Sequence, residues 1–401
     1  MAKPEIRLKG FEGEWEASKI GDVASVVGGG TPSTSVDSLW NGDIQWFTPS
    51  EVGKTRYVSK SERTISKEGL DKSSAKIIPA YSILLSSRAT VGESSINTCN
   101  CCTNQGFQSL IPKDIDLDFL YSLISTLKND FIRESSGSTF LEISANKVRE
   151  LDIFIPNNNE QEALGYYFKS LDSLLQSTTK KIESLKQMKQ ACLVSMFPQA
   201  GETTPRVRFK GFEGNWNYLP MSDIFMERHD ISTIMDSLPQ LSFTIEEGVI
   251  RPEDRKTNKR DFLIKDKSNK KYLVTRLDDI IYNPANVIYG AIHKNSLCDG
   301  VVSPIYKIFY TQQDPSFMEC VVRRPEFIKE MTIYMEGTVQ KLRTLKPEAF
   351  LKMSAYIAPS LEEQKKIGDY FRSLDKQISL QKQRLEKLKQ IKAACLDKMF
   401  V

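Results

Sequence analysis

The residues that could support catalysis are few and scattered. The tripeptide GKT at 53–55 ends like a phosphate-binding loop, but Thr48 stands where that loop needs its first glycine. The segment GGGTPS, which begins at Gly28, lacks the sixth-position glycine of a dinucleotide-binding turn. The only two histidines, His229 and His293, belong to no recognisable catalytic triad. These patterns favour ordinary loops over nucleotide or hydrolytic sites.

Three further motifs are incomplete in the same way. NPAN at 283–286 is similar to the Asn-Pro-Pro-aromatic tetrapeptide of amino-group methyltransferases, but it lacks the aromatic on which a flipped base would stack. We interpret it as a turn between strands. The Asp-x-Lys triplet at 254–256 has no convincing acidic partner upstream, and nuclease metals need several oxygen ligands. CNCC at 99–102 has no second ligand pair, which favours a structural role over zinc. The sequence therefore predicts a protein that is not an enzyme.

Basic charge is the stronger chemical signal. The chain has 55 Lys+Arg against 51 Asp+Glu, yet the stretch Arg251–Arg276 has ten basic and four acidic residues. Cations of this density bind phosphates, and interleaved asparagines can contact base edges. A solvated hairpin loop is the alternative interpretation. The residues that we predict to contact DNA are Lys54, Arg56, Arg88, Thr90, Gln105, Arg255, Lys256, Asn258, Lys259, Arg260 and Asn286.

Length and composition limit the class of protein that must position these residues. The chain has 401 residues, of which 40% are hydrophobic, so it can form two or three units with cores of their own. No run approaches the ~18 apolar residues of a membrane-spanning helix. The start, MAKPEIRLKG, has no hydrophobic core or cleavage signal of a secretory peptide. Together with seven cysteines, an odd number, this predicts free thiols and a cytoplasmic location.

The chain repeats itself. PEIRLKGFEGEWE at 4–16 and PRVRFKGFEGNWN at 205–217 are identical at eight of 13 positions. The segments 160–197 and 363–400, which are 203 residues apart, are identical at 18 of 38 positions. Such a match predicts two copies of one unit, each with a variable body followed by a long constant segment.

Each constant segment has the apolar pattern of a long helix. Apolar residues recur at steps of three and four, with Lys, Glu and Gln between them, as in a coiled-coil seam. So narrow a stripe on a lone helix needs a partner, and the obvious partner is the other copy. One polar residue interrupts the stripe at the same place in both copies, Thr178 and Gln381. The residues that we predict at the helix–helix interface are Leu164, Phe168, Leu171, Leu175, Ile182, Leu185, Ile367, Phe371, Leu374, Ile378, Leu385 and Leu388.

The two bodies hardly match in sequence but share a skeleton of short β-type runs, a helical stretch and a final extended piece that ends in proline. This predicts β-rich α+β folds. The expected divisions are a first body with its N-terminal segment at 1–156, a helix at 157–198, a linker with the repeated segment at 199–217, a second body at 218–359 and a helix at 360–401.

This arrangement resembles the DNA-specificity subunits of type I restriction–modification systems over essentially the whole chain. The resemblance is carried by GFEGEW and GFEGNW before the bodies, GGGTPS, WNGDIQWFTPSEV at 40–52, SGSTFLEIS at 136–144 and the EQ-x5-YF-x-SLD opening of each helix. The second body lacks GGGTPS and WNGDIQWFTP, so no base contact is transferred from one body to the other.

The resemblance implies two target-recognition domains on an antiparallel coiled coil with an internal pseudo-two-fold repeat. Each domain would contact half of a bipartite site in double-stranded DNA, and the helices would set the spacer. It also implies two methylase subunits that carry S-adenosylmethionine and two ATP- and Mg-dependent motor-nuclease subunits, with no cofactor or metal on this chain. Such complexes methylate DNA and defend against foreign DNA.

Two alternatives stay open from the sequence. The chain could be the recognition half of a methyltransferase or nuclease, which a cofactor-binding assay on the isolated protein would detect. It could also be a coiled-coil scaffold that binds no nucleic acid, against which salt-dependent DNA binding would argue.

Overall fold

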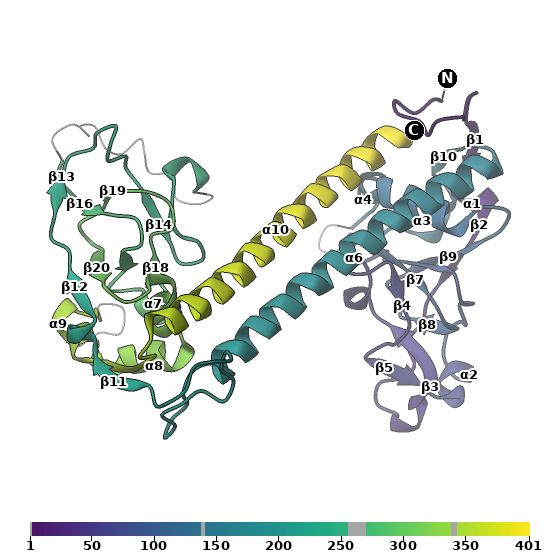
Figure 1. Ribbon diagram of the computed structural model, residues 1–401. Helices are drawn as coiled ribbons and strands as arrows, with labels where there is room; N and C mark the ends of the chain where they lie inside the picture. Colours follow the sequence, from purple (N-terminus) through teal and green to yellow (C-terminus); the bar gives the residue numbers. More distant parts are fainter. Residues whose placement is uncertain (1, 138–140, 256–269, 338–342) are drawn as a thin grey trace. The chain divides into compact units, whose positions relative to one another are not determined.

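The structure is a computed structural model and describes residues 2–137, 141–255, 270–337 and 343–401 (Figure 1). The chain forms two compact units. The first unit comprises residues 1–181 with 381–401, and the second unit comprises residues 182–380. Each unit therefore contains one body and a part of each of the two long helices.

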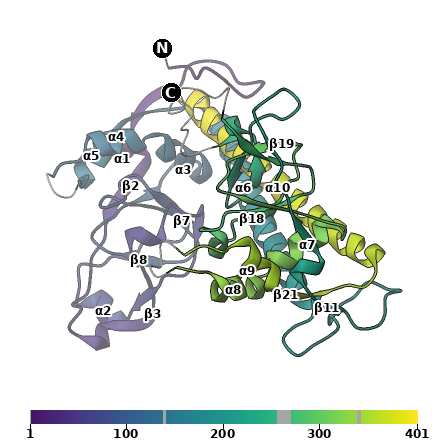
Figure 2. The same ribbon diagram turned by 90° about the vertical axis from the view of Figure 1, so that its left-hand side faces the viewer.

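The first body is built on a five-stranded sheet of order β2-β9-β6-β7-β4 and a three-stranded sheet of order β5-β3-β8. A separate pair, β1 with β10, joins the start of the body to its end. Figure 2 shows α1, α3 and α4 at one end of this body and β3 with α2 at the other. The elements are β1 Glu16–Lys19, α1 Ile20–Val23, β2 Ala24–Gly28, η1 Asp37–Leu39, β3 Trp40–Phe47, η2 Pro49–Glu51, β4 Tyr57–Val58, β5 Arg63–Ile65, α2 Lys67–Asp71, β6 Ile83–Leu85, β7 Ser94–Asn97, β8 Cys101–Thr103, β9 Gln108–Pro112, α3 Leu117–Thr126, α4 Lys128–Arg133, α5 Ala145–Glu150, β10 Asp152–Ile155 and α6 Asn158–Ser195.

The second body has a four-stranded sheet of order β12-β20-β17-β18, a three-stranded sheet of order β13-β16-β19 and the pairs β14-β15 and β11-β21. Pro325 does not interrupt a helix, because α7 has already ended and the proline occupies the first turn of α8. The elements are β11 Asn217–Pro220, η3 Met221–Asp223, β12 Phe225–Glu227, β13 Ile231–Ser232, β14 Ser242–Thr244, β15 Gly248–Ile250, η4 Pro252–Asp254, β16 Tyr272–Thr275, β17 Ile280–Tyr282, η6 Val287–Tyr289, β18 Ile292–Lys294, β19 Gly300–Val302, β20 Lys307–Thr311, α7 Pro315–Val322, α8 Pro325–Tyr334, α9 Pro347–Lys352, β21 Ser354–Ile357 and α10 Leu361–Met399.

The main sheets of the two bodies follow one plan although their sequences differ. In the first, β6 lies between β9 and β7, and β2 pairs with the far side of β9. In the second, β17 lies between β20 and β18, and β12 pairs with the far side of β20. Every one of these strand pairs is antiparallel. The α+β class that the sequence predicts is confirmed, and the shared plan gives a residue-by-residue correspondence between the bodies.

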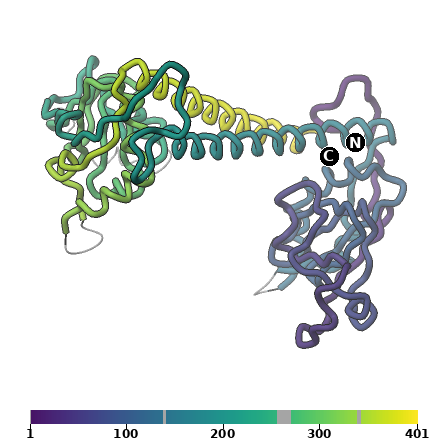
Figure 3. The backbone as a smooth tube through the Cα atoms, turned by 60° about the horizontal axis from the view of Figure 1, so that its bottom comes forward, coloured from purple at the N-terminus to yellow at the C-terminus, as the bar shows by residue number. Residues whose placement is uncertain are grey.

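The long helices α6 and α10 pack together in antiparallel orientation, and the contacts of one unit are repeated in the other (Figures 1 and 3). In the first unit the hydroxyl of Tyr167 lies 3.3 Å from the sulfur of Cys395. In the second unit Cys192 and Tyr370 form the same contact at the same distance. The two tyrosines are 203 positions apart in the sequence, and so are the two cysteines. The paired helices that the repeat predicts are therefore confirmed.

The apolar residues in the first turns of each long helix are buried against the body that precedes that helix in the sequence. Leu164, Phe168 and Leu171 belong to the core of the first body, and Ile367, Phe371, Leu374 and Ile378 belong to the core of the second. Ile182 and Leu185 are also buried, whereas Leu175, Leu385 and Leu388 are half-buried. The stripe thus serves two purposes, since its first turns pack against a body as well as against the other helix.

The repeated GFEG-x-W and EQ motifs form one structural joint. The guanidinium of Arg7 donates to both carboxylate oxygens of Glu160, at 2.7 and 2.6 Å. Arg208 binds Glu363 in the same bidentate manner in the second unit, at 2.6 and 2.8 Å. Both glutamates are fully buried, so the pairing compensates the cost of removing a carboxylate from water. The motif therefore ties the N-terminal segment to the start of the helix.

An aromatic side chain from the end of each helix completes the core of each unit. In the first unit Phe400 lies within 5.4–6.0 Å of the ring centres of Trp15, Phe119 and Phe168. In the second unit Phe197, at the end of α6, occupies the corresponding place beside Trp216 and Phe317, which lie 5.6 Å away in each case. This explains why both copies of the constant segment end in Met-Phe.

Candidate nucleic-acid interface

Several of the sequence motifs meet at one place in the first unit, which we call loop site 1. It consists of residues 28–33, 86–93, 103–107 and 142–144. Gly30 N donates to Thr103 O at 2.9 Å, and Ser87 N donates to Gly106 O at 2.8 Å. Ile143 N in turn donates to Ser87 O at 3.1 Å. The site is therefore held by the backbone, and its side chains stay free to vary.

Glycine is required where these loops approach most closely. A Cβ atom on Gly29 would lie 2.0 Å from the carbonyl oxygen of Asn104. At the tip of the second loop, Ala89 adopts a φ of 64°, which is unfavourable for any residue other than glycine, asparagine or aspartate. Strained backbone of this kind is concentrated at functional sites.

Four of the predicted DNA contacts present exposed side chains at or beside loop site 1. Arg88, Thr90 and Gln105 are exposed within it, and Gln105 accepts a hydrogen bond from Thr31. Lys54 is exposed on the neighbouring loop, where Gly53 packs against Glu93. These four side chains form a polar surface on a rigid base.

Two cations at or beside loop site 1, Arg88 within it and Lys128 on α4, already have carboxylate partners in the site. Arg88 lies 3.1 Å from Glu142, and Lys128 lies 2.5 Å from Glu93. Because these side chains are roughly 40% exposed, the ion pairs contribute at most about 1 kcal/mol each and can be exchanged for phosphate contacts.

The second unit builds the same site from different residues, which we call loop site 2. Residues 283–291 connect β17 to β18 as residues 86–93 connect β6 to β7. Leu345 N donates to Pro284 O at 3.0 Å, as Ile143 N does to Ser87 O. The loop that precedes it is closed by paired hydrogen bonds between Glu336 and Thr344, as the first unit closes its loop between residues 136 and 142. NPAN is therefore a turn between strands, as the sequence predicts.

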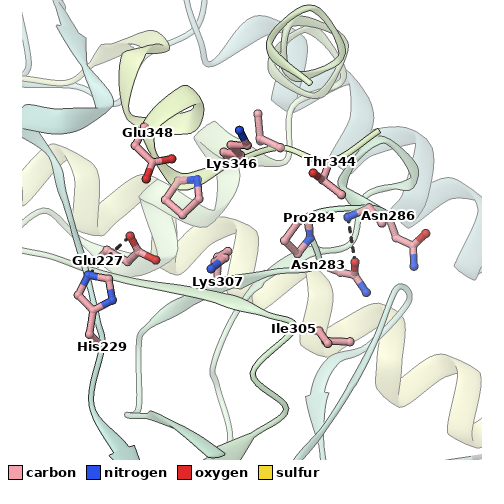
Figure 4. A pocket seen from close by; sticks show the side chains of 13 residues that line it. Glu227, His229, Asn283, Pro284, Asn286, Ile305, Lys307, Thr344, Lys346 and Glu348 are labelled. Carbon is pink, nitrogen blue, oxygen red and sulfur yellow. Dashed lines mark hydrogen bonds and ion pairs between the residues drawn. The ribbon is translucent and has the colours of Figure 1, made fainter. Parts of the chain in front are cut away.

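A hollow of about 780 Å³ opens at loop site 2 (Figure 4). Asn283, Asn286 and Ile305 lie on one side of it, and Glu227 with His229 lies on the other. The hollow is lined by Glu227, His229, Asn283, Pro284, Ala285, Asn286, Ile305, Lys307, Thr344, Leu345, Lys346, Pro347 and Glu348. The predicted residue Asn286 thus belongs to a concave polar surface.

A second, smaller hollow borders the same turn. Asn283 and Asn286 line it as well, together with Arg255, Phe243 and Tyr306. Burial raises the pKa of Tyr306, and the nearby charge of Arg255 opposes this shift. Four predicted residues of the basic stretch, Lys256, Asn258, Lys259 and Arg260, lie outside the described residues.

Arg56, which the sequence predicts to contact DNA, is buried in an ion-pair network in this structure. Its side chain is only 6% exposed, and it donates to Asp172 at 2.6 Å and to Asp118 at 2.8 Å. Its guanidinium also lies 4.5 Å from the ring centre of Tyr121. The hydrogen bonds of this guanidinium are thus made within the first unit, unlike those of the exposed predicted contacts. Arg56 instead ties β4 to α3 and α6.

Sequence reasoning missed Ile305, Lys307 and Lys346 because no motif marks them, and it assigned no DNA contact to His229 or Asn283. The signal that could have found them is positional, since each lies on a loop or strand end that corresponds to a motif of the first body. The cysteine cluster behaves as expected for structural residues, because burial raises the pKa of Cys101 to about 12 and that of Cys102 to about 11. Among the described residues, no group of three His, Cys, Asp or Glu could hold a metal ion. No helix in the same part of the chain is long and apolar enough to cross a membrane.

The architecture defines a duplicated α+β protein in which two long antiparallel helices join two bodies that each carry the same loop site. Comparison with known proteins finds relatives of a part of the chain. The family described as "Type I restriction modification DNA specificity domain" matches residues 12–187. The MjaIX specificity subunit of Methanocaldococcus jannaschii is 35% identical over 180 residues, which cover 44% of this chain and 42% of that protein. The EcoR124I/EcoR124II specificity subunit of Escherichia coli is 30% identical over 187 residues, which cover 45% and 46%. These matches span less than half the length of either relative.

The fold similarity extends over the complete chain. The type I restriction–modification S subunit from M. genitalium superimposes with a TM-score of 0.64 at 16% identity, covering 100% of this chain and 99% of that one. Residues 12–187 therefore match the type I restriction–modification DNA specificity domain, and the fold of the whole chain is similar to that of a solved S subunit.

Proposed function

We propose that this protein is the DNA-binding specificity subunit of a type I restriction–modification complex, in which each body contacts one half of a bipartite target. The observation that carries the proposal is the pair of loop sites. The two sites share the backbone hydrogen bond from Ile143 N to Ser87 O or from Leu345 N to Pro284 O, whereas the side chains that they present differ. A constant scaffold with variable polar side chains is the arrangement expected of two modules that recognise different base sequences.

In this proposal the bodies at 1–156 and 218–359 are the target-recognition domains, and α6 and α10 set the spacing between the half-sites. The catalytic groups lie on partners: two methylase subunits with S-adenosylmethionine, and two motor-nuclease subunits that use ATP and Mg. The chain itself contributes binding without catalysis, and it acts in the cytoplasm on double-stranded DNA. Lys54, Arg88, Thr90 and Gln105 are the proposed contacts of the first domain, and Arg255 and Asn286 are those of the second.

Exchanging residues 218–359 for the corresponding body of a relative tests this proposal. We expect one half of the methylated sequence to change and the other half to stay the same, because each loop site is complete within its own unit. The measurement is the sequence motif that becomes methylated in cells that express the chain with its methylase. A motif that changes in both halves together would contradict independent domains, and methylation without any sequence preference would contradict the proposal as a whole.

Phosphate contacts give a second prediction. Replacing Lys259 and Arg260 together by Ala should weaken binding to every DNA sequence and flatten its salt dependence. Each lost phosphate contact removes about 0.9 from the slope of log affinity against log salt concentration. The affinity of the methylase complex, measured at several salt concentrations, checks this. An unchanged slope would remove these two residues from the DNA interface.

A further inference from the structure

The turn at 283–286 in the second unit borders two hollows. Asn283 and Asn286 line both of them. Charged side chains of both signs accompany the asparagines: Lys307, Lys346, Glu227 and Glu348 in the first hollow, and Arg255 and Glu246 in the second. The side chains of the turn itself, rather than a surplus of charge, therefore distinguish this surface.

The side chains of the two asparagines of this turn differ in their hydrogen bonding. The side-chain oxygen of Asn283 accepts a hydrogen bond from Ala285 N at 3.1 Å and is therefore used by the turn itself. The backbone of Asn286 is hydrogen-bonded within the turn, whereas its side-chain amide forms no hydrogen bond with any other described residue. Asn286 can thus present both a donor and an acceptor to a ligand.

An exposed apolar side chain accompanies Asn286. Ile305 is 59% exposed and is therefore accessible to a ligand. It lies on the same side of the hollow as Asn283 and Asn286 (Figure 4). One amide and one apolar group therefore face the same space.

This combination matches one base pair. An asparagine amide forms two hydrogen bonds with the N6 and N7 atoms of adenine in the major groove, and an apolar side chain contacts the methyl group of thymine. A G·C pair offers neither the N6 donor nor the methyl group. We propose that Asn286 and Ile305 together recognise an A·T pair in the half-site of the second domain. This inference rests on the proposed function.

The first unit lacks both side chains at the corresponding positions. The register of the main sheets shows which positions of the two bodies are equivalent. Ala89 is equivalent to Asn286, and Gly106 is equivalent to Ile305. The Asn–Ile pair is therefore particular to the second domain. The first domain presents Arg88 from its turn instead, and arginine pairs preferentially with guanine. The difference accounts for two half-sites of unlike sequence on one scaffold.

The first experiment determines the methylated motif in cells that express the methylase with the full chain, as wild type or as Asn286→Ala, Asn286→Asp or Ile305→Ala. We expect one A·T position of the second half-site to lose its preference by about 5- to 150-fold in Asn286→Ala. Asn286→Asp should disfavour adenine, because its carboxylate cannot donate to N7. The first half-site should not change in any variant, which also shows that the subunit is folded. Asn217→Ala, an exposed asparagine on β11 away from the hollow, is the matched control.

The second experiment isolates the thymine contact. Replacing the thymine of that pair by deoxyuridine removes only the methyl group. Binding of the wild-type complex should weaken several-fold, whereas Ile305→Ala should bind the thymine and deoxyuridine sites equally. Two results would overturn the inference: an unchanged motif in Asn286→Ala, or a deoxyuridine effect of the same size in Ile305→Ala and wild type. The proposed function would stand in either case, provided that the wild type remains sequence-specific. A wild type without sequence preference would overturn both.

Discussion

Replacing Phe400 by Ala should lower the free energy of unfolding of the first unit by about 3–5 kcal/mol. The side chain is 7% exposed and packs against Trp15, Phe119 and Phe168. Its removal leaves a cavity where the N-terminal segment, α3 and α6 meet. Hydrogen exchange of the amides in β6 and β9 measures the loss.

The chain provides a matched variant for this test. Phe197→Ala removes the corresponding ring from Trp216, Phe317 and Phe371 in the second unit. We expect each variant to increase exchange mainly in its own unit, since each ring lies within one core. Equal loss of protection in both units from either variant would contradict this assignment of the two cores.

Replacing Arg56 by Ala should destabilise the first unit by about 3 kcal/mol at neutral pH, the lower end of the range for a buried ion pair that loses one partner. The lower end applies because Asp118 and Asp172 keep a lysine each, Lys169 at 2.9 Å and Lys392 at 2.5 Å. Thermal unfolding of wild type and variant measures the difference. Lys189→Ala is the control, because its partner Asp375 is 53% exposed and the pair should contribute no more than about 1 kcal/mol.

The same network predicts the direction of a pH effect. Burial alone would raise the pKa of Asp118, but hydrogen bonds from Lys169 and Arg56 lower it below the usual 3.8. A carboxyl whose pKa is depressed by folding stabilises the native state above its unfolded pKa, and this contribution is lost as the pH falls through the folded value. Wild type should therefore lose stability below about pH 4, the unfolded carboxyl pKa. In Arg56→Ala the loss should be smaller, and an equal loss in both proteins would contradict this role of Arg56.

The sequence by itself determined the duplication, the long paired helices and the α+β class. These features depend on local periodicity and on residues that both copies retain, such as the Glu-Gln opening of each helix and the terminal Met-Phe. In each case one physical requirement, a buried apolar stripe or a buried ion pair, acts on the same residue types wherever they occur. The pattern is therefore visible without the fold.

Only the tertiary structure decided which polar residues face solvent and which residues of the second body form its site. Arg56 lies two positions from the exposed Lys54, yet the chain turns it inward toward two carboxylates that follow it by 62 and 116 residues. Asn286 and Ile305 share one hollow because β17 and β20 are neighbours, although no motif connects them. Ion pairing and strand order join residues that are distant in sequence, and no local pattern encodes these contacts.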